Sequence, residues 1–140
     1  MNLLSKYIAL TVLCVSPLAS AQSKPSASTT QYAVTFNKIV DSCDGKGLKL
    51  QSASMAVSQA GDTLSIVIPD LATLTGKVGR RGKLRASSSR EFKSKGLRAR
   101  FGINGRVTGN SLRAVFTAEY FKLDKTPLCT QSFSVSGKSS

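Results

Sequence analysis

The chain of 140 residues contains no histidine and no tryptophan, and only seven of its residues are acidic. Without histidine there is no Ser-His-Asp or Cys-His nucleophilic system, no imidazole zinc site and no ordinary proton shuttle near neutral pH. The acids are scattered, and their spacing indicates neither a catalytic carboxylate pair nor a regular calcium loop. We therefore expect a protein that is not an enzyme and that needs no cofactor or metal ion.

Long apolar runs are also missing. The run over residues 7–15 follows Lys6 and precedes the small residues Ala19 and Ala21. A membrane-spanning helix needs about 20 apolar residues, so this run is too short. The order of features is that of a secretory signal peptide. We expect residues 1–21 to be cleaved, leaving a periplasmic or secreted protein without a transmembrane segment.

Cysteine is scarce, with three in the chain, and Cys14 falls inside the predicted signal peptide. Cys43 and Cys129 remain, and an oxidising compartment favours a disulfide between them. On the chain-entropy model, this bond would stabilise the folded state by about 4 to 5 kcal/mol. The alternative is two free thiols available for chemistry.

The dominant period of the sequence is two, which is typical of strands with one face on a core. Leu97, Ala99 and Phe101 alternate with Arg98 and Arg100, and a Gly-Asn turn joins this run to a second alternating run. The same pattern predicts eight strands, at 32–41, 48–58, 63–69, 74–78, 83–91, 97–107, 111–123 and 128–136. The predicted inward positions are Tyr32, Val34, Phe36, Leu64, Ile66, Ile68, Leu84, Ala86, Leu97, Ala99, Phe101, Leu112, Ala114, Phe116, Ala118, Tyr120, Phe133 and Val135.

Short connections leave no room for crossover helices, so we expect a single small antiparallel meander barrel, all-β in class, over residues 32–136. Closure would bring Cys43, after the first strand, beside Cys129, at the start of the last. A two-sheet sandwich is the alternative. Residues 22–31, rich in Ser, Thr and Pro, are predicted to be a disordered leader, and 137–140 a flexible tail.

Short meander strands with a disulfide at the seam resemble the small secreted barrels of the lipocalin, avidin and bacterial protease-inhibitor kinds. The resemblance covers residues 32–136 and concerns architecture alone, because no signature motif accompanies it. Barrels of this size either hold one small ligand or are filled by side chains. Fold likeness by itself implies no function.

Positive charge is the outstanding compositional feature, with 20 Lys and Arg residues and a formal net charge of +13. Twelve of these cations and one acid, Glu91, fall between residues 77 and 113. Period-two alternation predicts that six of them share one outward face, without interleaved acids. These six are Lys83, Arg85, Arg98, Arg100, Arg106 and Arg113, with Arg80 and Arg81 extending the field at one rim.

A basic face of this kind predicts binding of an anionic lipid or glycan of the cell envelope, such as lipopolysaccharide or phospholipid head groups. Nucleic acid is a weaker expectation, because the basic block has few aromatic platforms for stacking. The main rival is a protein-binding module, such as an inhibitor of an exported enzyme that acts through rim loops. A carrier of a small apolar ligand inside the barrel is third. We expect the protein to act as a monomer.

Overall fold

The computed structural model describes residues 27–140, so the predicted signal peptide and residues 22–26 of the predicted leader lie outside the described range. No helix in this part of the chain is long and apolar enough to cross a membrane. Single turns of 3-10 helix at Arg80–Gly82 and Lys93–Lys95 precede two of the strands. The strands are β1 (Ser28–Asp41), β2 (Ser52–Ala60), β3 (Thr63–Ile68), β4 (Ala72–Val78), β5 (Lys83–Phe92), β6 (Leu97–Thr108), β7 (Ser111–Lys122) and β8 (Pro127–Ser139).

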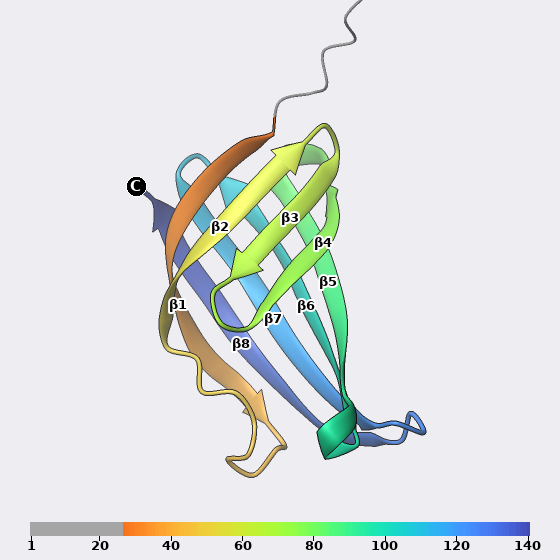
Figure 1. The fold of residues 1–140 in the computed structure, drawn as a ribbon. Coiled ribbons are helices and arrows are strands. Elements are labelled where there is room, and N and C mark those ends of the chain that lie inside the picture. Colours follow the sequence, from red (N-terminus) through yellow and green to blue (C-terminus); the bar gives the residue numbers. More distant parts are fainter. Residues whose placement is uncertain (1–26) are drawn as a thin grey trace, which may run out of the picture.

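The eight strands form one closed antiparallel barrel, in which each strand pairs with its sequence neighbours and β8 returns to pair with β1 (Figure 1). The predicted meander barrel is confirmed, and the alternative sandwich is wrong. The β2–β3, β4–β5 and β6–β7 turns lie together at what we call the turn end. The loop over residues 42–51 and the β5–β6 and β7–β8 connections lie at the opposite end, which we call the disulfide end (Figure 1).

The core consists of the inward side chains of all eight strands. Every predicted inward residue is buried except Leu97 and Tyr120, which are half-buried near the disulfide end. Four phenylalanines fill the middle of the barrel, with neighbouring ring centroids 6.0 to 6.4 Å apart. They are Phe36, Phe101, Phe116 and Phe133. The barrel interior is therefore packed across its middle, and any sizeable ligand site must lie at an end or outside.

Several predicted boundaries differ from those observed. β1 begins at Ser28, because Ser28–Gln31 pair with Gln59–Ala56 of β2, so the end of the predicted leader is strand. β8 continues to Ser139, because Gly137–Ser139 pair with β1, so most of the predicted tail is strand too. Residues 48–51, predicted to open the second strand, belong to the loop instead. At Leu48, the backbone N–H and carbonyl bond to a side chain of β8 instead of to a neighbouring strand.

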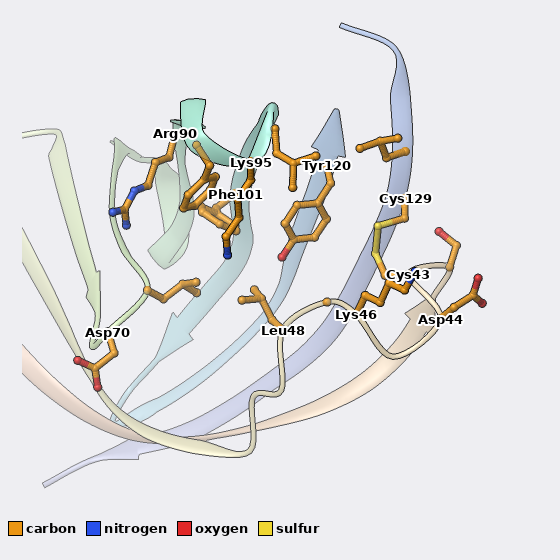
Figure 2. A pocket seen from close by; sticks show the side chains of 16 residues that line it. Cys43, Asp44, Lys46, Leu48, Asp70, Arg90, Lys95, Phe101, Tyr120 and Cys129 are labelled. Carbon is orange, nitrogen blue, oxygen red and sulfur yellow. A yellow bond between two sulfur atoms is a disulfide. The ribbon is translucent and has the colours of Figure 1, made fainter. Parts of the chain in front are cut away.

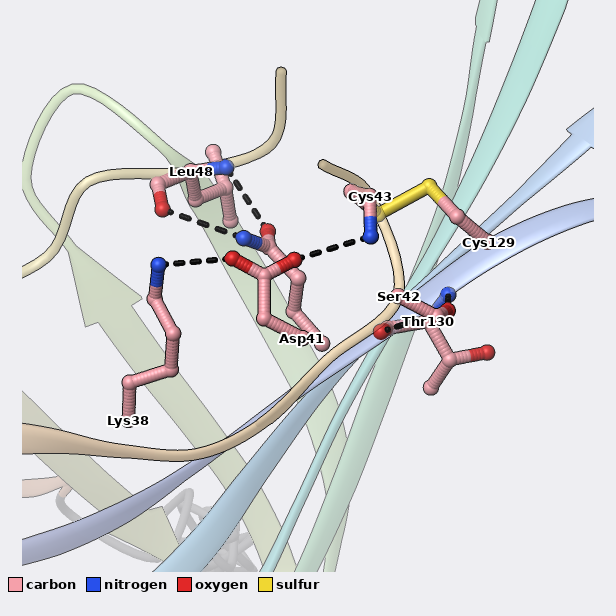
Figure 3. A network of polar contacts seen from close by, with 8 residues as sticks. Lys38, Asp41, Ser42, Cys43, Leu48, Cys129 and Thr130 are labelled. Carbon is pink, nitrogen blue, oxygen red and sulfur yellow. Dashed lines mark hydrogen bonds and ion pairs between the residues drawn. A yellow bond between two sulfur atoms is a disulfide. The ribbon is translucent and has the colours of Figure 1, made fainter. Parts of the chain in front are cut away.

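That side chain is Gln131, which is 1% exposed. Its Oε1 accepts a hydrogen bond from the backbone N–H of Leu48 at 2.7 Å, and its Nε2 donates to the Leu48 carbonyl at 3.3 Å (Figure 3). A glutamine side chain can satisfy both backbone groups of one residue in this way. The loop over residues 42–51 is thereby tied to β8 without forming a strand.

The predicted disulfide is confirmed, and it joins the loop that follows β1 to β8, the two strands whose pairing closes the barrel. Cys43 and Cys129 are bonded, with their Cα atoms 5.1 Å apart. Beside the bond, the Ser42 N–H donates to the Thr130 carbonyl at 3.0 Å, and the Thr130 N–H donates to the Ser42 hydroxyl oxygen at 2.9 Å. The seam between β1 and β8 is therefore fixed covalently and by hydrogen bonds at the disulfide end (Figure 3).

Candidate anion-binding face

A row of three cations crosses three neighbouring strands on the outside of the barrel. Lys83 of β5 is directly opposite Arg106 of β6, and Arg106 is directly opposite Arg113 of β7. Residues paired in this way project from the same face, and all three side chains are exposed. One row further along, Lys77 of β4 is opposite Arg85 of β5.

We call these five residues, Lys77, Lys83, Arg85, Arg106 and Arg113, the basic face. Within residues 27–140, none of the five takes part in an ion pair. Directly opposed like charges destabilise a sheet by roughly 0.2 to 1 kcal/mol per pair. The basic face is thus a set of cations whose mutual repulsion an anion would relieve.

Arg98 and Arg100 also project outward, but acids neutralise them. Arg98 is opposite Glu91 and forms an ion pair with it. Arg100 is opposite Glu119, with Nη1 3.7 Å from Oε2, and its guanidinium lies 5.5 Å from the ring centroid of Phe121. The prediction of an outward field without interleaved acids is therefore wrong for the half of the face nearer the disulfide end. It fits the half nearer the turn end.

Arg80 and Arg81 lie in the exposed β4–β5 turn, next to Lys83 along the chain. Arg81 has a φ of 57°, in the left-handed region. That conformation costs a residue with a Cβ about 1 to 2 kcal/mol, and glycine would avoid the cost. The turn therefore keeps an arginine side chain at the rim at some expense in stability.

Two shallow grooves run between these cations. The larger, of about 760 Å³, is bordered by Lys77 and Arg85 on one side and by Arg100 and Glu119 on the other. Its remaining lining includes the hydroxyl groups of Thr75, Ser87 and Thr117 and the amide of Asn104. Gly102 faces outward here and leaves open space, because a Cβ at this position would have no atom within 4 Å.

The smaller groove, of about 530 Å³, lies nearer the turn end and is bordered by Lys83, Arg85 and Arg106. Lys77, Arg85 and Asn104 line both grooves. The face thus offers cations, hydroxyl groups and an amide along one continuous surface. These groups bind phosphate, carboxylate or sulfate oxygens and the hydroxyl groups of sugars.

Several acids are held by neighbouring groups: Glu91 and Glu119 pair with arginines, and Asp41 is held at the disulfide end. Within residues 27–140, no group of three or more Cys, Asp or Glu side chains is placed to hold a metal ion. The Asp41 carboxylate accepts a hydrogen bond from the Lys38 ammonium at 2.7 Å and another from the Cys43 N–H at 2.9 Å (Figure 3). These bonds lower the pKa of Asp41 below 3.8.

Comparisons with protein-family models, with curated proteins and with solved structures give no match to this chain. What the protein binds must therefore be inferred from its own surfaces.

Sequence reasoning placed the outward cations correctly but missed what surrounds them. The alternation of Arg98, Arg100 and Arg106 with apolar residues is a sufficient signal for their common face. The partners Glu91 and Glu119 depend on the register between strands, which one sequence leaves open. The grooves form where small residues such as Gly102 lie beside other small residues on neighbouring strands. The pattern along a single strand does not predict which residues become neighbours.

Proposed function

We propose that the protein is an exported binding protein, without enzymatic activity, that holds an anionic component of the cell envelope on the basic face. The observation that carries the proposal is the row of Lys83, Arg106 and Arg113, opposed across three strands with no acid among them. The seam disulfide supports export, because such bonds persist in oxidising compartments.

The chemistry of the two grooves favours a phosphate- or carboxylate-bearing glycan, free or as the sugar portion of a glycolipid such as lipopolysaccharide. Arginine guanidinium groups bind phosphate and carboxylate in bidentate fashion. The hydroxyl groups of Thr75, Ser87 and Thr117 suit sugar hydroxyls. Single-stranded nucleic acid would require aromatic stacking platforms, and the only aromatic residue lining either groove is Phe101, which is buried.

The test is a binding titration of the oxidised protein, lacking residues 1–21, against four targets in parallel. These are lipopolysaccharide, vesicles containing phosphatidylglycerol, neutral phosphatidylcholine vesicles and DNA. Each titration is repeated over about 50 to 200 mM salt, because phosphate contacts weaken as counterions compete. We expect lipopolysaccharide to bind most tightly and to retain some affinity at the higher salt concentration through hydrogen bonds to its sugars.

Two triple variants with the same net charge decide whether the basic face is the site. Lys83→Gln/Arg106→Gln/Arg113→Gln removes three unpaired cations of the basic face, whereas Lys38→Gln/Arg98→Gln/Lys122→Gln removes three cations that line neither groove. Each charge-assisted contact contributes about 1.5 to 3 kcal/mol, so losing one weakens binding about 10- to 150-fold. We expect the first variant to lose at least this much affinity and the second to change affinity less than threefold. Equal losses in both would make the attraction generic and overturn the proposal.

A protein partner at the disulfide end is the second candidate, favoured by an anchored loop beside exposed apolar side chains. The disulfide and Gln131 hold the loop over residues 42–51, as rigid inhibitory loops require. Three exposed apolar side chains lie close to this loop. Ile39 and Val40, near the end of β1, are 57% and 52% exposed, and Leu128, at the start of β8, is 45% exposed. Inhibition of a panel of exported hydrolases that is lost in Val40→Ser but unaffected by the basic-face triple variant would favour this function.

A further inference from the structure

The barrel is open at the disulfide end because two of its strands are short. β3 and β4 have six and seven residues, whereas β6, β7 and β8 have 12, 12 and 13. The wall is therefore low on one side, and the β3–β4 turn stops well above the lower ends of the long strands (Figure 1). The inner surface of β5, β6 and β7 is left uncovered at their lower ends.

A pocket of about 650 Å³ occupies this mouth (Figure 2). Its volume falls within the roughly 300 to 1,000 Å³ that is usual for small-ligand sites. Phe101 lies at its inner end, 2% exposed and stacked on Phe116 at 6.0 Å between ring centroids. The sides include Leu71, Phe92, Leu97 and the disulfide. An apolar chain that entered here would rest on the aromatic layer that fills the middle of the barrel.

The pocket also contains a cation at an inward position. Arg90 of β5 is directly opposite Ala99, which is fully buried, so Arg90 is on the inner side of the strand. Its guanidinium lies 5.0 Å from the ring centroid of Phe92, and within residues 27–140 it forms no ion pair. Lys46 and Lys95 line the same pocket (Figure 2). Two acids, Asp44 and Asp70, also lie at its edge.

An inward arginine has a physical consequence for any ligand. In the open mouth Arg90 is exposed, so water can reach its guanidinium. Once an apolar chain displaces that water, the charge must be paired or it becomes costly to bury. A ligand that carries its own anion satisfies this requirement, and an uncharged one does not.

We propose that the barrel mouth binds a single-chain amphiphile with an anionic head group. The chain lies against Phe101 between Leu71 and Leu97, and the head group pairs with Arg90 and Lys95. Tyr120 lines the pocket, and burial raises the pKa of its hydroxyl above 10.0, so it stays protonated and can donate a hydrogen bond to the head group. This site lies on the inner surface of β5 and is separate from the basic face, so either proposal can fail without the other.

The experiment is isothermal titration of the oxidised protein with octanoate, dodecanoate, dodecyl phosphate and dodecanol, the anions below their micelle concentrations and dodecanol below its solubility limit. We expect one ligand per chain and a gain of about fourfold in affinity for each methylene that enters the pocket. Dodecanol should bind at least about tenfold more weakly than the better of the two anions, because it leaves Arg90 unpaired. Comparison of dodecanoate with dodecyl phosphate then identifies the preferred head group.

Arg90→Gln and Arg85→Gln form a matched pair, since both remove an exposed arginine from β5 but from opposite faces. Arg90→Gln should lower the affinity for both anions about tenfold or more and should not lower the affinity for dodecanol, which no longer buries an unpaired charge. Arg85→Gln should leave all four ligands unchanged. The proposal is overturned by affinity that does not depend on chain length, by the absence of saturable binding, or by equal effects of the two variants.

Discussion

Gln131 is the buried polar side chain on which the disulfide-end loop depends, and Gln131→Met is the sharpest test of that dependence. Methionine preserves the length of the side chain but has no donor and only a weak acceptor. The substitution removes the bonds to the Leu48 N–H and carbonyl, at 2.7 and 3.3 Å. Leu48 is half-buried, so its backbone groups must then find water by lifting the loop from the barrel.

The expected cost follows from these contacts. Two net hydrogen bonds contribute about 1 to 3 kcal/mol together, and the methionine's more favourable burial offsets part of the loss. The Cys43 disulfide still tethers one end of the loop, which limits how far it can move. We expect the free energy of unfolding to fall by about 2 kcal/mol, which corresponds to a fall in Tm of roughly 6 to 10 °C for a domain of this size.

Urea denaturation measures the global loss, and amide hydrogen exchange at Leu48 measures the local one. Gln59→Met is the matched control, because Gln59 is exposed and, within residues 27–140, its side chain forms a hydrogen bond only to the Gly61 carbonyl. It should change stability by less than about 0.5 kcal/mol. If Gln131→Met changes stability as little as the control while the Leu48 amide stays protected, Gln131 does not anchor the loop.

Three further predictions concern the seam, the barrel wall and the acid limit. Cys43→Ser/Cys129→Ser should lower the free energy of unfolding in denaturant by about 4 to 5 kcal/mol, and a loss under 1 kcal/mol would contradict the chain-entropy account. Gly105→Ala should cost about 1 to 3 kcal/mol in the same assay, because its Cβ would lie 2.4 Å from the Ala114 Cβ, whereas Gly102→Ala should be nearly neutral. The pKa of Asp41 is lowered on folding, so its contribution is present above pH 3.8 and is lost as pH falls through the lower folded-state value. Asp41→Asn should therefore flatten the acid limb of a stability curve measured between about pH 5 and 2.

Much of the fold could be predicted because it rests on a local signal. Alternation along residues 97–107 and 111–123 defined two strands and their inner faces, and the Gly-Asn turn between them defined the hairpin. The positions of Cys43 and Cys129 also predict a closed barrel, because only a closed meander brings the first and last strands together. The limits at Ser28 and Ser139 could not be predicted, because polar residues become strand there only through pairing with a neighbouring strand, Ser28 with β2 and Ser139 with β1.

The candidate sites depended on information that one sequence does not contain. The outward direction of Arg106 and Arg113 can be predicted from the alternation of side chains along a strand. The neutralisation of Arg100 cannot, because it depends on the strand register that places Glu119 opposite it. Arg90 could have been found, because the inward parity of Leu84 and Ala86 continues to residue 90. A charged residue at an inward position normally argues against a core-facing strand. Residue 90 is accessible to solvent because β3 and β4 are short and leave the end of the barrel open.

The pairing of β8 with β1 also means that the barrel has no preferred starting strand. Ser139 is opposite Tyr32, and Ser28 lies four residues further along β1, a distance of about 13 Å. A short glycine-serine linker could join these ends, and the chain could be opened in the exposed β6–β7 turn. In such a circular permutant the disulfide would close a loop of about 30 residues instead of 86 and stabilise the fold by about 1 kcal/mol less. The order of the strands along the chain could therefore change while the barrel, its outer basic face and its open mouth stayed the same.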